Sequence, residues 1–166
     1  MKKLMLVLLT SLTIATSLFA KDGVPRQKIN LMGELLPSAP KAISIKDMES
    51  FRKPESVTIF DPYNKNIKTV FYGFYLHELV KAYAKPDFKT LKVVAIDGYK
   101  VDIPKADITS ANLFMSYKDD KGYLTVDRMG PGRIVAPVEG IINKDLLLKI
   151  GVYWVWQVKS LEFSKK

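Results

Sequence analysis

The sequence predicts an α+β fold that is mainly β, with a few short helices. Segments of alternating or β-branched apolar residues outnumber the helical segments. Helices and strands also do not alternate regularly, as they would in a doubly wound sheet. Only residues 74–84 have a long helical pattern, because Leu76, Leu79, Val80 and Tyr83 fall on one face.

Local signals place the helices. Pro86 sets the end of the helix over 74–84. Residues 42–51 begin with strand-like alternation and continue as a helix of one to two turns. Residues 143–151 form a short helix that Asn143 caps and Gly151 stops.

The strands follow from apolar alternation between turn residues. On the last of them, Trp154, Trp156 and their apolar neighbours Val152 and Val158 share one face, which is typical of a core. The predicted strands cover residues 28–35, 56–62, 69–73, 91–97, 100–104, 111–117, 133–137 and 152–158.

The N-terminus is typical of a secretory signal peptide. Two lysines precede an apolar stretch, and small residues come before the polar segment that starts at Lys21. We expect cleavage after Ala20, with Ser17 as the alternative, and one domain over residues 21–166 that reaches the periplasm as a soluble protein. The alternative is a retained membrane anchor, although the apolar span is short against the about 20 residues that cross a bilayer.

Composition excludes several classes of site. The chain has 166 residues and no cysteine, so it has no disulfide, thiolate ligand or cysteine nucleophile. Its net charge of +9 comes from scattered lysines, which are typical of a solvated surface. The alternative is that they favour an anionic ligand or an acidic membrane surface. Because an exported protein does not normally meet nucleic acid, this charge does not predict a nucleic-acid partner.

Several segments, in order, resemble one family over most of residues 21–166. The family is the oxidoreductase molybdopterin-binding domain, which has the fold of the sulfite oxidase catalytic domain. The matching segments are KINLMGEL, FYGFYLHELVKAY, VVAIDGYKVDIPKADI, MGPGRIVAP and YWVWQVKSLEF.

The chain departs from this family at the metal. Sulfite oxidase-type enzymes hold molybdenum through a pterin dithiolene and a cysteine thiolate, and a soft metal prefers such a soft ligand. The only histidine, His77, lies inside a predicted helix, and the adjacent Asp119 and Asp120 are typical of a turn. We therefore predict no metal ligands and no catalytic residues.

A smaller, cysteine-poor branch of the fold is the more similar one. Its members are periplasmic proteins that bind a reduced, metal-free pterin and signal to a membrane-bound cyclic-di-GMP enzyme. The resemblance therefore implies a pterin ligand and a membrane partner for this chain, with molybdopterin as the alternative ligand. It does not imply an oligomeric state.

Five side chains are candidates for binding this flat, polar ligand. Arg133 matches the Gly-Pro-x-Arg start of a strand in the family, and its planar guanidinium could stack or donate a fork of hydrogen bonds. As a residue at a strand edge, it is expected to contribute little to packing. Trp156 matches a Trp-Gln step of the family.

The other three candidates come from turns and strand ends. Asp97 could pair with the guanidine-like edge of a pterin, and Tyr99 follows it in a turn that Gly98 permits. The alternative for Asp97 is a hydrogen bond to its own turn backbone. Tyr117 ends a predicted strand.

Three functions remain open on the sequence. The first is an exported pterin-binding protein without catalysis. The second is a small molybdenum-cofactor oxidoreductase whose metal ligand is not cysteine. The third is an interaction module that has kept the fold and lost the ligand.

Overall fold

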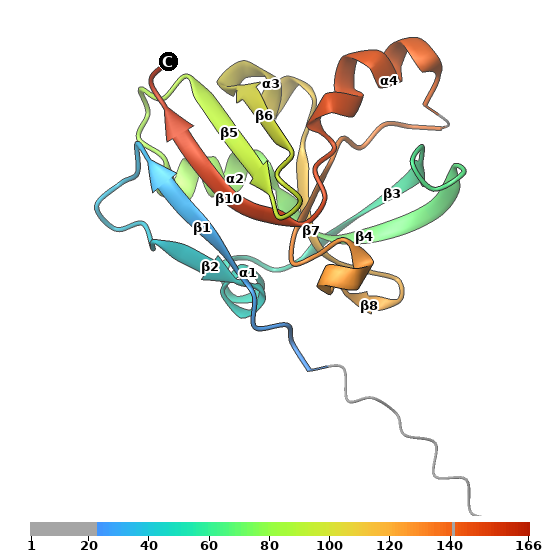
Figure 1. The fold of residues 1–166 in the computed structure, drawn as a ribbon, viewed down its shortest axis with the longest axis horizontal. Helices are drawn as coiled ribbons and strands as arrows, with labels where there is room; N and C mark the ends of the chain where they lie inside the picture. The colour runs from blue at the N-terminus through green and yellow to red at the C-terminus, as the bar shows by residue number, and fades with distance from the viewer. Residues whose placement is uncertain (1–22, 141) are drawn as a thin grey trace, which may run out of the picture.

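Two β-sheets form the frame of this computed structural model, which describes residues 23–140 and 142–166 (Figure 1). The expected signal peptide over residues 1–20 lies outside the described residues. Neighbouring strands are antiparallel except β1 and β10, which pair in parallel. The first sheet has the order β2-β1-β10-β5-β6, with β1 at Lys28–Gly33, β2 at Ala42–Ser44, β5 at Thr90–Ala95, β6 at Lys100–Pro104 and β10 at Val158–Ser164.

The second sheet is antiparallel throughout. It has the order β3-β4-β7-β8, and β9 pairs with β7 off this path. A register shift interrupts the pairing of β4 with β7 between Tyr72 and Gly73. The strands are β3 at Glu55–Asp61, β4 at Ile67–Tyr75, β7 at Phe114–Asp119, β8 at Gly122–Tyr123 and β9 at Arg133–Val135.

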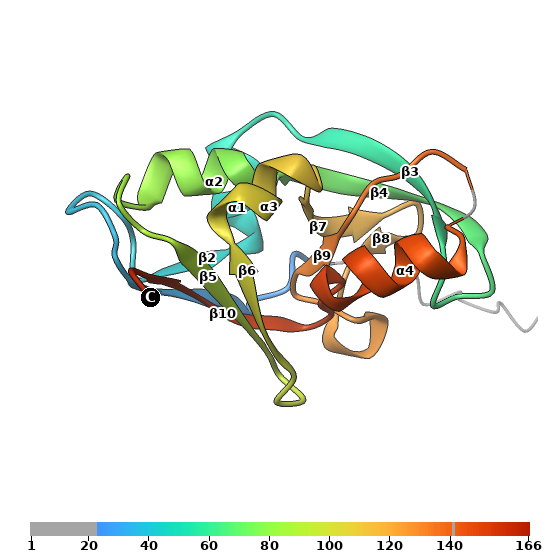
Figure 2. The same cartoon turned by 90° about the horizontal axis from the view of Figure 1, so that it is seen from above.

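Short helices connect the strands. Figure 2 shows α2 and α3 above the first sheet and α4 apart from them, beside the second sheet. Two of the α-helices have side-chain N-caps, from Ser44 to α1 and from Asn143 to α4. The helices are α1 at Ile45–Phe51, α2 at Leu76–Tyr83, α3 at Lys105–Ser110 and α4 at Lys144–Ile150, with 3₁₀ turns η1 at Val126–Arg128 and η2 at Gly151–Tyr153.

The predicted α+β class is confirmed, but the strand predicted over 152–158 is wrong. The chain turns through η2 there, and Gln157 has a φ of +52°, so β10 begins only at Val158. Val152 is 47% exposed whereas Trp154 is 4% exposed, so the expected common face is wrong too. The alternation of apolar residues over 152–158 did not predict the structure correctly, because residues in a turn do not point alternately to two faces as they do in a strand.

Apolar side chains from both sheets form one core. Ile29, Leu91 and Leu161 contribute from the first sheet, and Ile59 and Phe114 contribute from the second. Within residues 23–140 and 142–166, no helix has the length and apolarity needed to cross a bilayer.

Candidate functional site

A cavity of about 490 Å³ lies where three connections meet. They are the β3–β4 turn, the β5–β6 turn and the segment from α4 through η2 to Trp156. This volume lies in the range that is typical of small-molecule sites. The lining residues are Tyr63, Ala95, Asp97, Tyr99, Leu147, Leu148, Gly151, Val152, Trp154 and Trp156.

Aromatic rings dominate one wall of the cavity. The ring of Tyr63 lies 5.1 Å from that of Trp156 in an edge-to-face arrangement, and 5.6 Å from that of Trp154. Aromatic pairs at these distances stabilise one another beyond their burial alone. The wall therefore offers preformed aromatic surface to a flat ligand.

Two tyrosine hydroxyls join the walls together. The hydroxyl of Tyr63 donates to the Gly151 carbonyl at 3.1 Å, and that of Tyr99 donates to the Val152 carbonyl at 2.8 Å. Burial is the main cause that raises the pKa of Tyr63, and Tyr99 and Asp61 add to it. The Tyr63 hydroxyl thus stays protonated at neutral pH. The hydrogen bonds of both hydroxyls connect the β3–β4 and β5–β6 turns to η2.

Asp97 lies in the β5–β6 turn, at the exposed rim of the cavity. Its Oδ1 accepts from the backbone N–H of Tyr99 at 3.0 Å, and Gly98 takes a φ of +91° between them. This is the turn-forming role that the sequence left open. Oδ2 has no partner among the described residues, so it remains available to accept a hydrogen bond from a ligand.

Arg133 lies behind the aromatic wall and is not among the lining residues. It is only 6% exposed, and its Nη2 donates to Asp61 Oδ2 at 2.8 Å. Its Cζ is 5.4 Å and 5.5 Å from the rings of Trp154 and Trp156. The expectation that Arg133 contributes little to packing is therefore wrong, because its neighbours enclose it.

Burial, the Asp61 carboxylate and the Phe71 ring all act on the guanidinium of Arg133. Burial lowers the pKa of its guanidinium, while the nearby carboxylate of Asp61 acts in the opposite direction. The ring of Phe71, at 5.0 Å, adds a further cation–π contact. Nε is buried without a partner among the described residues.

Asp61 connects this arginine to the cavity. Its Oδ1 accepts from the backbone N–H of Tyr63 at 3.0 Å, and its carbonyl accepts from the N–H groups of Asn64 and Asn66. One buried residue thus holds both the turn that carries Tyr63 and the guanidinium that lies behind the indoles.

The GPGR segment, residues 130–133, lies against the chain that precedes β10. The backbone of Val158 donates to the Gly132 carbonyl at 2.9 Å, and Ile134 and Val155 exchange two backbone hydrogen bonds. A Cβ on Gly132 would come within 2.7 Å of Ile29 Cδ1. Gly132 therefore permits close core packing at this position.

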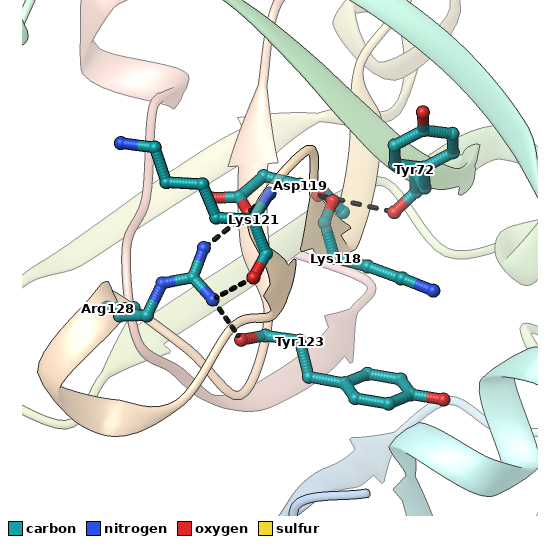
Figure 3. Close-up of polar contacts among 7 residues, drawn as sticks. Tyr72, Lys118, Asp119, Lys121, Tyr123 and Arg128 are labelled. Atoms are coloured by element: carbon teal, nitrogen blue, oxygen red, sulfur yellow. Dashed lines mark hydrogen bonds and ion pairs between the residues drawn. The ribbon is translucent and has the colours of Figure 1, made fainter. Parts of the chain in front are cut away.

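Arg128 fastens the loop that leads into this segment (Figure 3). It pairs with Asp119 and donates to the carbonyls of Lys121 and Tyr123, at 3.2 Å and 2.9 Å. Asp119 also accepts from the N–H of Lys121, which makes the Asp119–Asp120 pair part of a turn, as its sequence indicates.

Tyr117 lies away from the cavity. It is 1% exposed in β7, its hydroxyl has no partner among the described residues, and burial raises its pKa to about 12. The structure thus brings three of the five candidates, Trp156, Asp97 and Tyr99, to one cavity. It places Arg133 behind that cavity and Tyr117 in the core.

Sequence reasoning missed two of the aromatic lining residues. Trp154 was assigned to the core, and it is indeed buried, yet one side of it lines the cavity. Tyr63 follows the turn residues Asp61 and Pro62, and an aromatic residue in such a turn was the available signal.

His77 lies outside this cavity. Its ring stacks on that of Tyr75 at 5.7 Å, and it borders a separate hollow of about 400 Å³ between α2 and α3. Within the described part of the chain, no three His, Asp or Glu side chains gather as metal ligands would.

Comparison with known proteins establishes the fold. No protein-family model matches the chain, and no curated protein matches its sequence. Among solved structures, the sulfane dehydrogenase SoxCD from Paracoccus pantotrophus is similar, with a TM-score of 0.59 at 15% identity. The fold is the predicted sulfite-oxidase-like fold. The likeness covers 84% of this chain but only 38% of that one, so it extends to the fold and not to the activity.

Proposed function

We propose that this chain is an exported, non-catalytic protein that binds a reduced, metal-free pterin in the cavity beside Trp156. The observation that carries the proposal is the cavity itself. Tyr63, Trp154 and Trp156 supply aromatic surface, and the unpaired oxygen of Asp97 supplies an acceptor at the rim.

These groups match the chemistry of a pterin. The ligand is a flat bicycle whose pyrimidine edge carries neighbouring N–H donors. Aromatic walls can stack on its faces or contact its edges. The carboxylate of Asp97 can accept from its donor edge, as a charge-assisted hydrogen bond.

Export and signalling belong to the same proposal. The N-terminal residues 1–20 have the pattern of a signal peptide, which supports a periplasmic location. A membrane-bound cyclic-di-GMP enzyme as partner rests on the resemblance to the small pterin-binding branch alone.

A molybdenum-cofactor oxidoreductase is the second candidate, because the fold resembles that of such enzymes. The residues present do not fit a thiolate-held metal. The chain has no cysteine, and the lining offers a single carboxylate, that of Asp97, and no imidazole. We therefore derive no reaction step at this site.

Analysis of the ligand that co-purifies from the periplasm tests these functions. Protein isolated without oxygen would be denatured, and the released material examined by fluorescence, mass spectrometry and metal analysis. A pterin with molybdenum well below one equivalent supports the proposal. Near-stoichiometric molybdenum supports the oxidoreductase. No released ligand, together with no binding of added tetrahydrobiopterin, supports a module that has lost its ligand.

A further inference from the structure

The cavity lining is almost free of charge, although the chain as a whole is strongly basic. Among the ten lining residues, all of them described, the single charged side chain is that of Asp97. The net charge of the chain is +9. The lysines that produce this charge are therefore absent from the surface that a ligand in the cavity would touch.

The lining also offers acceptors rather than donors. Tyr63 and Tyr99 use their hydroxyl hydrogens on backbone carbonyls, so their oxygens present lone pairs. The indole N–H groups of Trp154 and Trp156 have no partner among the described residues, but both nitrogens are buried and expose almost no surface to a ligand. With the free Oδ2 of Asp97, the polar atoms at the lining side chains favour a ligand that donates hydrogen bonds.

Arg133 does not change this balance. Its charge is compensated by Asp61 at 2.8 Å, and the indole rings of the wall lie between 5 and 6 Å from its Cζ. An anion in the cavity would gain no direct contact with this guanidinium. It would also lose its hydration against aromatic walls, which is costly for a charged group.

We propose that the cavity selects a planar ligand that carries N–H donors and no anionic group, and that it discriminates against phosphorylated pterins. This inference rests on the proposed pterin function and deepens it. Asp97 is the residue that determines the selection, because it is the one charged side chain of the described lining and its negative charge disfavours an anionic ligand in the same cavity. The volume of about 490 Å³ leaves room for a short ring substituent, so a phosphate on it would lie near the lining.

A matched pair of ligands tests the inference. Dihydroneopterin and dihydroneopterin triphosphate have the same ring and side chain and differ in the phosphates. Calorimetric titration without oxygen, at an ionic strength of about 0.15 M, limits the effect of distant lysines because screening then acts over about 8 Å. We expect dihydroneopterin to bind on the order of tenfold more tightly than its triphosphate, because like charges repel at the site.

Two variants with the same change in charge separate the site from the surface. Asp97→Lys should remove or reverse the preference. Asp120→Lys, in the exposed β7–β8 turn outside the lining, should preserve it. Asp97→Asn should weaken the preference without adding a cation, and melting curves would show that each variant is folded.

The outcomes are distinct. Equal or tighter binding of the triphosphate by the unmodified chain would overturn the inference while leaving a pterin site in place. Equal effects of Asp97→Lys and Asp120→Lys would overturn it as well, since net charge would then explain the preference. If neither pterin binds, the proposed function fails, and this inference fails with it.

Discussion

Arg133 and Asp61 form a buried ion pair in which Nη2 of the arginine lies 2.8 Å from Oδ2 of the aspartate. Arg133 is 6% exposed and Asp61 is 2% exposed. The pair joins the start of β9 to the end of β3, which are 72 residues apart in sequence. The pair also lies directly behind the aromatic wall of the cavity. Breaking it should therefore change both the stability of the fold and the position of the two indole rings.

Breaking this pair should be strongly destabilising. Asp61→Asn keeps an acceptor for the Tyr63 N–H but leaves the charge of Arg133 buried without a partner. We expect a loss of about 3–5 kcal/mol in the free energy of unfolding, measured by denaturant titration. Arg133→Ala should cost a similar amount.

Two further variants serve as controls for that prediction. Asp61→Asn with Arg133→Met removes both charges and should recover part of the loss, because no uncompensated charge remains. Lys85→Met breaks the exposed pair between Lys85 and Glu34 and should cost at most about 1 kcal/mol. A cost below about 1 kcal/mol for Asp61→Asn as well would show that water reaches the Arg133 charge.

Trp154 should contribute mainly to the stability of the fold, and Trp156 mainly to ligand binding. Trp154 is 4% exposed, so Trp154→Ala should cost about 3–5 kcal/mol of stability as a buried aromatic. Trp156 is half-buried and contacts Tyr63 across the wall. Trp156→Ala should therefore cost less stability and mainly weaken the binding of tetrahydrobiopterin, by about tenfold if a contact of about 1.5 kcal/mol is lost.

Denaturant titration and calorimetry on the same preparations separate these effects. Trp156→Phe keeps an aromatic ring and should recover part of the affinity. If Trp156→Ala binds as tightly as the unmodified chain, the aromatic wall does not contact the ligand.

The sequence predicted most elements because they obey local rules. The apolar stripe that includes Leu76 and Leu79 correctly predicted α2, and Asn143 caps α4 as expected. The segment 152–158 could not be predicted in this way. Its conformation depends on bonds to distant residues, such as those of Ile134 with Val155 and of Tyr153 with Asp107.

The candidate site was predictable only in part, for a related reason. Asp97 and Tyr99 lie in a turn that Gly98 permits, and this turn was visible in the sequence. That Arg133 points into the core depends on Asp61, whose position follows from the pairing of β3 with β4. No local pattern around Arg133 specifies that partner.

The hydrogen bond from Tyr153 to Asp107 should make stability depend on alkaline pH. Its acceptor, the Asp107 carboxylate, is the main cause that raises the pKa of Tyr153 from 10.0 to about 12. Because the folded pKa is the higher one, the stabilisation is complete below pH 10 and is lost as the pH rises through about 12.

Tyr153→Phe provides the comparison. The difference in unfolding free energy between the unmodified chain and this variant should shrink over that pH interval, as measured by denaturant titration. Tyr117, whose pKa is also about 12, is present in both chains and cancels from the difference. A difference that stays constant up to pH 12 would show that Tyr153 does not ionise against Asp107.

Helix α4 should unfold locally without unfolding of the core, and a bound ligand should stabilise it. None of its residues is buried, and its side-chain cap is the bond from the Leu146 N–H to Asn143 Oδ1 at 2.8 Å. Leu147 and Leu148 nevertheless line the cavity.

Asn143→Ala should destabilise the helix by about 1 kcal/mol. The amides of α4 should then exchange with solvent several-fold faster, while those of β10 change little, since the helix unfolds as a local unit. Bound tetrahydrobiopterin should slow the exchange in α4, because Leu147 lines the cavity that the ligand would occupy. Asn143→Ser retains a capping oxygen and should behave like the unmodified chain. If Asn143→Ala accelerates exchange in α4 and β10 equally, then α4 unfolds only with the core, and it does not act as a separate wall of the site.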